Sequence, residues 1–185
     1  MAHLLCGQTE LCLCHTCSLV DCDTNGEDQG CEGSHMDDAI DFNRHNRCLA
    51  TEVNFPYTGE DDSCIRKKST NHAADINDHE DVPVNSEKAV LNAMANQPIS
   101  VAIDASGFVF QFYFSGVFNG DCCIELDHGF TAVDYEAASD GTKYCLVKNL
   151  WGIGWGEEGY IRMQRDVDSA EGLRGIAMMT SYPTA

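Results

Sequence analysis

Five stretches rich in β-branched and aromatic residues follow one another in the second half of the chain, with glycines between most of them. They are ISVAI at 99–103, FQFYF at 110–114, GFTAV at 129–133, YCLVKN at 144–149 and YIRMQ at 160–164. Residues of these types favour strands, and glycine-rich connections allow tight turns between strands. The pattern predicts an antiparallel sheet or barrel in this half of the chain.

The first half shows helical spacing instead. In residues 36–49 a helical spacing places four side chains on one face: Met36, Ala39, Ile40 and Asn43. Acidic residues occupy the first turn, where the helix dipole favours them. A second helix is expected to begin after a cap at Asn85 or Ser86 and to run through Asn96, because Gln97-Pro98 would stop it. Residues 54–85 are rich in turn-forming types and are predicted to be loop-dominated. Helices followed by strands indicate the α+β class.

Charge and hydropathy exclude two classes of partner. The formal net charge is −19, and no basic run could follow a phosphate backbone, so nucleic acid is not expected to bind. Polar residues interrupt every apolar run well before the roughly 20 residues that a membrane-spanning helix needs, so no membrane span is expected.

Eleven cysteines are many for a chain of 185 residues and favour an oxidising compartment, and their odd number leaves at least one without a partner in the same chain. Residues 1–20 lack the basic and apolar regions of a signal peptide. Residues 1–18 differ from the rest in composition and are interpreted as a separate segment. Their Cys-x-Cys-His-x-Cys pattern leaves a metal-binding module within residues 1–31 open as an alternative, although it lacks a matched second half.

Two segments carry a family resemblance: ELDHGFTAVDY at 125–135 and KYCLVKNLWGIGWGEEGYIRM at 143–163. Together they resemble the histidine and asparagine regions of the papain-like cysteine peptidases. The stretches EDVPVNSEKA and DGTKY are similar to those of plant members in particular. Four further segments match the family and occur in the family's order along the chain: GCEGSHMDDA, NFPYTG, NQPISVAIDA and SYP. The resemblance covers residues 19–183.

The resemblance implies a papain-like two-domain fold. Residues 19–80 would be the remnant of an incomplete helical left domain, and residues 81–185 an antiparallel, β-barrel-like right domain that carries His128 and Asn149. The unmatched Cys-rich segment 1–18 would precede both domains.

The resemblance also implies chemistry. In this family a cysteine thiolate attacks the peptide carbonyl, and a neighbouring imidazolium protonates the leaving amine. The matching imidazole is His128, the amide that orients it is Asn149, and Trp151 is the indole that shields their hydrogen bond from water. No cofactor or metal is implied.

The family nucleophile lies in a motif like Cys-Gly-[Ser/Ala]-Cys-[Trp/Tyr], about 130 to 150 residues before the histidine and asparagine. The chain contains no such motif, and the glutamine of the oxyanion hole is missing with it. We therefore expect an endopeptidase by ancestry, truncated before LVDCD and inactive as this chain. A non-catalytic protein that binds peptides or inhibitors is the alternative, and replacement of the nucleophile by one of the N-terminal cysteines 6, 12, 14 or 17 is a weaker one.

Other positions carry over from the family in the same way. The substrate-binding positions would be Gly33, Ser34, His35, Met36, Ala102, Gly129 and Met179. Cys22 and Cys64 match a disulfide pair, whereas Arg174 stands where relatives have the cysteine that pairs with Cys122. The expected partners of a monomeric chain are peptide or protein substrates and cystatin-like inhibitors. The family suggests a vacuolar, lysosomal or extracellular location, and no signal peptide is visible in this chain.

Overall fold

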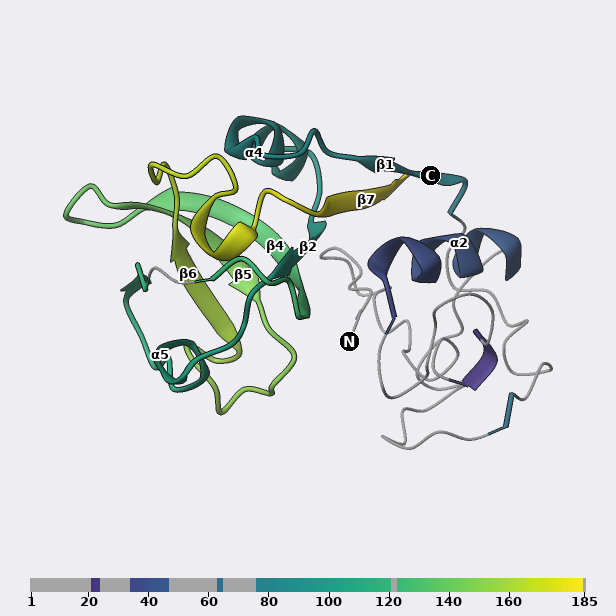
Figure 1. The fold of residues 1–185 in the computed structure, drawn as a ribbon, viewed down its shortest axis with the longest axis horizontal. Coiled ribbons are helices and arrows are strands. Elements are labelled where there is room, and N and C mark those ends of the chain that lie inside the picture. Colours follow the sequence, from purple (N-terminus) through teal and green to yellow (C-terminus); the bar gives the residue numbers. More distant parts are fainter. Residues whose placement is uncertain (1–20, 24–33, 47–62, 65–75, 121–122, 185) are drawn as a thin grey trace. The chain divides into compact units, whose positions relative to one another are not determined.

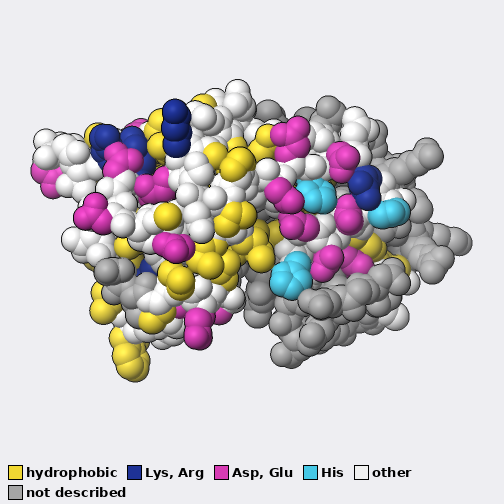
Figure 2. Space-filling model, turned by 45° about the horizontal axis from the view of Figure 1, so that its top comes forward, with side chains coloured by type: hydrophobic (Ala, Val, Ile, Leu, Met, Phe, Trp, Pro, Cys, Tyr) yellow, Lys and Arg dark blue, Asp and Glu magenta, His cyan; other side chains and the backbone are white. Residues whose placement is uncertain are grey.

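The computed structural model describes residues 21–23, 34–46, 63–64, 76–120 and 123–184 (Figure 1). The chain divides into an N-terminal unit, Met1–Glu80 with Pro183–Ala185, and a C-terminal unit, Asp81–Tyr182. Acidic side chains are spread over the face shown in Figure 2, as the net charge of −19 requires. None of the helices in the described residues has the length and apolar character needed to cross a membrane.

The N-terminal unit contains helix α2, Met36–Asn46, with Asp37 and Asp38 in its first turn. The predicted helix at 36–49 is confirmed as far as residue 46, and 47–49 lie outside the described residues. The face that begins with Met36 and includes Ile40 and Asn43 is buried, as its spacing predicts.

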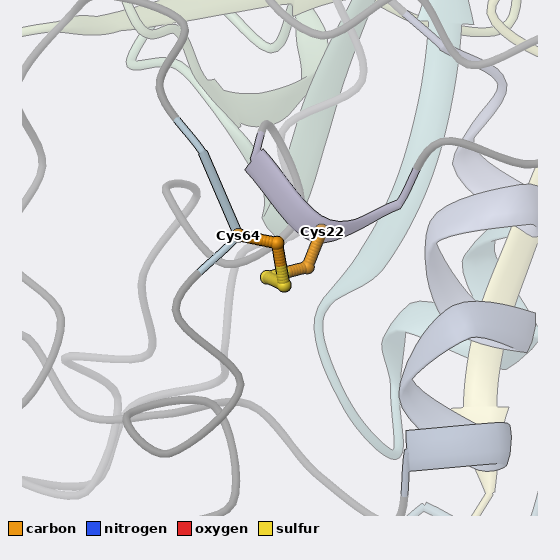
Figure 3. Close-up of a disulfide and its surroundings, with 2 residues drawn as sticks. All are labelled: Cys22 and Cys64. Carbon is orange, nitrogen blue, oxygen red and sulfur yellow. A yellow bond between two sulfur atoms is a disulfide. The ribbon is translucent and has the colours of Figure 1, made fainter.

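A disulfide joins Cys22 to Cys64 in the N-terminal unit, as the resemblance implies (Figure 3). The two cysteines are 42 positions apart in sequence. On the chain-entropy estimate, closing a loop of this length stabilises the folded state by about 4 kcal/mol.

The described strands form a seven-stranded sheet in the order β1-β7-β2-β4-β5-β6-β3. Their bounds are β1 Asp78–Asp81, β2 Ile99–Ile103, β3 Val117–Phe118, β4 His128–Ala137, β5 Lys143–Lys148, β6 Tyr160–Gln164 and β7 Thr180–Thr184. The pairs β2/β4, β2/β7, β4/β5 and β5/β6 are antiparallel, whereas β3/β6 is parallel. The predicted strands at 99–103, 129–133, 144–149 and 160–164 are confirmed within a residue or a few at their ends.

The predicted strand at 110–114 is wrong, because its first two residues belong to helix α5, Phe108–Gln111. This helix begins directly after Gly107, which has a φ of 88°. The aromatic residues at 110, 112 and 114 alternate as in a strand, but burial does not follow that alternation. Phe110 and Tyr113 are buried, three positions apart, while Phe112 and Phe114 are exposed. A spacing of three is that of a helical turn, so the buried positions, and not the aromatic ones, define the period.

The second predicted helix is confirmed as α4, Glu87–Met94. The Ser86 hydroxyl accepts a hydrogen bond from the Ala89 amide at 3.3 Å, which satisfies one of the free N–H groups of the first turn. Val90 and Met94 point into the core of the C-terminal unit. The helix ends two residues before Asn96.

Arg174 is a buried cation in the 3₁₀ turn η2, Leu173–Gly175. Its Nη1 donates to the carbonyl oxygens of Asp104 and Ser106, both at 2.9 Å, and lies 3.6 Å from the Asp104 carboxylate. Its guanidinium also lies over the rings of Phe110 and Phe118, 5.2 and 5.4 Å from their centroids. A network of polar and cation–π contacts therefore surrounds Arg174, at the position where the family resemblance predicts a half-cystine.

We expect Arg174→Met to lower the free energy of unfolding by about 3–5 kcal/mol, because it leaves the buried Asp104 carboxylate without its cation. Chemical denaturation at neutral pH measures the change. The matched control is Lys143→Met, which removes a cation from an exposed pair with Asp166 and should cost less than about 1 kcal/mol. If the two substitutions lowered the free energy of unfolding equally, the buried network would not be the larger stabilising contribution that we propose.

Candidate active site

His128 is the first residue of β4, and its position is fixed by pairing with β2 and by the hydrogen bonds of the preceding residue. It lies opposite Ile103, the last residue of β2, in the antiparallel register. The preceding residue, Asp127, donates its amide to the Ile103 carbonyl at 3.1 Å. The Asp127 carboxylate accepts a hydrogen bond from the Ala105 amide at 2.7 Å. The imidazole therefore projects from a place where two strand ends are tied together.

Asn149 directly follows β5, which pairs with β4 in antiparallel register. The start of β4 and the end of β5 therefore lie next to each other, and His128 Nε2 is 3.2 Å from Asn149 Oδ1. The backbone amide of Asn149 is held by the Gly159 carbonyl at 2.9 Å. Two residues 21 positions apart in sequence are brought into contact by strand pairing alone.

The hydrogen bonds around Asn149 also determine which nitrogen of the His128 imidazole carries hydrogen. Asn149 Oδ1 accepts a hydrogen bond from the Leu150 amide at 2.7 Å, which fixes which end of the side-chain amide is oxygen. An oxygen that only accepts requires His128 Nε2 to carry hydrogen, so Nδ1 is the ring nitrogen left for acid–base chemistry. Asn149 is only 3% exposed, so water competes little for this bond.

Aromatic rings enclose the imidazole on two sides. The Phe130 ring meets it edge to face at a centroid distance of 4.6 Å, and the Trp151 indole lies 5.3 Å away at an interplanar angle of 32°. Phe110 contacts both of these rings, at 5.9 and 6.0 Å. Trp151 is still 41% exposed, so it forms the boundary between this cluster and solvent.

Burial lowers the pKa of His128 below its ordinary value of 6.5. The hydrogen bond that His128 donates to Asn149 and the negative charge of Asp127 raise the pKa but do not outweigh burial. The imidazole at this site is therefore held closer to its neutral form than a histidine in water.

The glycine-punctuated loop after Asn149 has a defined shape. Gly156 has a φ of 59°, and a Cβ at this position would lie 2.5 Å from the Tyr160 carbonyl oxygen, so only glycine fits. Trp155 Nε1 donates to the carbonyl of Gln111 at 2.9 Å, which ties the loop to α5. These contacts explain the spacing of tryptophan and glycine in the motif.

Three of the predicted substrate-binding residues lie together. Ala102 pairs with Gly129 across β2 and β4, and the Ala102 amide donates to the Met179 carbonyl at 3.0 Å. The Met179 side chain remains 37% exposed. Ala102 and Gly129 are buried, so Met179 is the exposed apolar side chain of this group, and Gly129 directly follows His128 in the chain.

The other predicted substrate-binding residues belong to the N-terminal part of the chain. Ser34, His35 and Met36 belong to the N-terminal unit, where His35 is exposed and Met36 is buried. Gly33 lies outside the described residues, as do the four N-terminal cysteines and the whole segment 1–18. The metal-binding alternative in that segment therefore stays a prediction. Within the described residues of the C-terminal unit alone, no three His, Cys, Asp or Glu side chains are grouped to hold a metal ion.

Cys145 is the free cysteine among the described residues, and it lies on β5 in the core. Burial raises the pKa of its thiol to about 12, with a further contribution from the charge of Glu87. Cys123 is disulfide-bonded. In the described part of the chain, therefore, no free thiol is placed to form a thiolate beside His128.

Sequence analysis missed Asp127 and Phe130 as supports of the imidazole. The signal for Phe130 was available, because residues two apart on a strand share one face of the sheet. Asp127 could not be identified from sequence, since its role depends on the Ala105 amide 22 positions away.

A comparison with known proteins identifies the family. The protein-family model described as "Papain family cysteine protease" matches residues 3–184. The chain belongs to this family. It is 54% identical over 167 residues to the "Senescence-specific cysteine protease SAG39" of Oryza sativa subsp. indica, covering 90% of this chain and 49% of the relative. It is 53% identical over 165 residues to "Vignain" of Vigna mungo, covering 89% and 45%.

Solved structures agree. The bromelain protease from Ananas comosus in complex with the E64 inhibitor superposes with a TM-score of 0.85 at 42% identity, covering 90% of this chain and 75% of that one. The proform of the Amb a 11 cysteine protease, a ragweed pollen allergen, gives 0.85 at 39% identity, covering 90% and 50%. The fold is thus papain-like and α+β, as predicted. The chain spans about half the length of the curated relatives it matches.

We expect NMR titration to give His128 a pKa below 6.5, because burial disfavours the imidazolium. Asn149→Ala should lower the pKa further, since the lost hydrogen bond favours the protonated ring. Because the folded pKa lies below the unfolded one, the histidine's contribution to stability is present above pH 6.5 and is lost as the pH falls through the folded pKa. Asn96→Ala, an exposed change on another element, is the control and should leave the His128 pKa unchanged. An unchanged or higher pKa in the Asn149 variant would contradict the assigned hydrogen bond.

Proposed function

We propose that this chain carries the histidine half of a papain-type cysteine endopeptidase site. The observation that carries the proposal is the contact of His128 Nε2 with Asn149 Oδ1 at 3.2 Å, partly covered by Trp151. Membership of the papain family supports this assignment.

The three residues would have distinct roles in peptide-bond hydrolysis. A cysteine thiolate attacks the carbonyl carbon, and the imidazolium gives its Nδ1 proton to the leaving amine, which leaves an acyl-enzyme for water to hydrolyse. Asn149 holds the ring through Nε2 without adding a negative charge, so the ion pair of thiolate and imidazolium is preserved. Trp151 limits access of water to that hydrogen bond.

As this chain of 185 residues, the protein is proposed to be inactive. The printed sequence contains no Cys-Gly-[Ser/Ala]-Cys-[Trp/Tyr] motif. The free thiol that the described residues do contain, Cys145, is buried and has a pKa of about 12, so it supplies no nucleophile.

The expected result is that the chain, folded under oxidising conditions and assayed at mildly acidic pH, shows no turnover of a fluorogenic dipeptide substrate. An active-site-directed thiol reagent should label no cysteine stoichiometrically, because no thiolate lies beside the imidazole. The His128→Ala variant is the matched control, since turnover that survives this change comes from a contaminant. Turnover abolished by His128→Ala, with one labelled N-terminal cysteine, would overturn the proposed inactivity and still support the histidine site.

A second candidate function is binding of peptides or cystatin-like inhibitors without cleavage. The observation that favours it is the exposed apolar side chain of Met179, whose backbone is bonded to the Ala102 strand opposite Gly129, next to His128 in the chain. Binding an aliphatic or aromatic group there needs no nucleophile.

For this function we expect saturable binding of a dipeptide aldehyde or a cystatin-like inhibitor, measured by calorimetry. Met179→Glu should weaken binding at least tenfold, because it replaces the exposed apolar side chain with a charged one. Val109→Glu is the control, since Val109 is 69% exposed and lies on α5, not on the strands that carry Ala102 and Gly129. Absence of saturable binding to a folded sample would exclude this function.

A further inference from the structure

Four large hydrophobic side chains are exposed on one short segment of the C-terminal unit. Phe108, Val109, Phe112 and Phe114 are 77%, 69%, 75% and 80% exposed. The rings of Phe108 and Phe112 stack on each other with centroids 6.1 Å apart. We call these four residues the α5 patch. Single exposed hydrophobic residues are common, but a group of this size on one segment marks an interaction surface.

The α5 patch is held in place by the core beneath it. Phe110, between the exposed residues, is fully buried. The Phe112 amide donates to the Phe108 carbonyl at 2.9 Å, and the Gln111 carbonyl accepts from Trp155 Nε1 at 2.9 Å. The patch is therefore preformed, and little ordering would be required for it to bind.

The segment that carries the α5 patch is uncharged. Residues 105–120 contain no Asp, Glu, Lys, Arg or His, in a chain that is 22% charged with a net charge of −19. Figure 2 shows acidic side chains spread over the visible face of the molecule. A segment without charged residues can meet a second copy of itself without bringing its own carboxylates together, and the Glu157 carboxylate that contacts the Gly116 amide is paired with Arg162.

The area of the α5 patch is sufficient for such a pairing. Since a whole aromatic side chain has about 150–250 Å² of surface, the three exposed rings and Val109 offer roughly 550 Å² per copy. Two copies facing each other would bury roughly 1,100 Å², which passes the threshold of roughly 1,000 Å² for a specific interface but stays at its low end. An interface of this size predicts weak, reversible association.

We propose that two copies of this chain pair through their α5 patches in a two-fold symmetric dimer. In such a dimer the same surface of each copy faces its counterpart, as an uncharged apolar patch allows. This replaces the monomer expected from the sequence, and it does not depend on whether the chain hydrolyses peptides.

The test is sedimentation of the folded, oxidised full chain over a series of protein and sodium chloride concentrations. We expect a reversible monomer–dimer equilibrium that tightens as salt rises, because the salt screens repulsion between the acidic surfaces. Phe112→Ser and Phe108→Ser should each weaken dimerisation at least tenfold. Both positions are largely exposed, so both variants should keep the circular dichroism spectrum of the parent chain.

The matched control is Val84→Ser, which removes an exposed hydrophobic side chain just before α4, away from α5 within the same unit (Figure 1), and should leave dimerisation unchanged. Peptides covering residues 107–116 should also exchange their amide hydrogens more slowly at high protein concentration. A folded chain that stays monomeric throughout would overturn the proposal. So would dimers that resist SDS without reductant, or dimers that the α5 variants do not affect.

Discussion

The C-terminal unit depends on the burial of one ring, Phe110. It is fully buried, and its partners come from strands, the glycine-punctuated loop and the η2 turn: Phe118, Phe130, Trp151, Trp155 and Arg174. Rings packed at near-right angles hold each other more specifically than aliphatic side chains do. The same ring therefore connects the residues that enclose the imidazole with the buried contacts of Arg174.

The placement of the histidine and the asparagine follows from strand pairing and not from the loops around them. Because β4 starts beside the point where β5 ends, residues at these two ends must meet, whatever the length of the connection. Register then decides which residues meet, and a slip by one residue would turn the His128 side chain to the other face of the sheet. The glycines that follow Asn149 allow the chain to turn away at once, so that its amide oxygen stays free to accept two hydrogen bonds.

Much of this could be predicted from the sequence, and the remainder shows where local patterns fail. Runs such as 99–103 and 129–133 are rich in apolar and β-branched residues, and the sheet formed where they predicted it. The run at 110–114 failed, because its aromatic residues include solvent-facing ones, which no periodicity rule separates from core residues. The two-residue strand β3 and the contacts of Arg174 also escaped prediction. Both depend on partners far along the chain, whereas His128 and Asn149 were found because the two segments that carry them resemble those of a known family.

The burial of Cys145 changes the meaning of the cysteine count. An odd total suggests a spare thiol that is open to oxidation, exchange and cross-linking between molecules. Here one cysteine lies in the core with a thiol that stays protonated at any physiological pH, so it behaves as a small hydrophobic residue. Setting Cys145 apart from the eleven leaves ten, an even number. The odd total therefore does not by itself require a thiol that is open to solvent, since Cys145 fills space in the core.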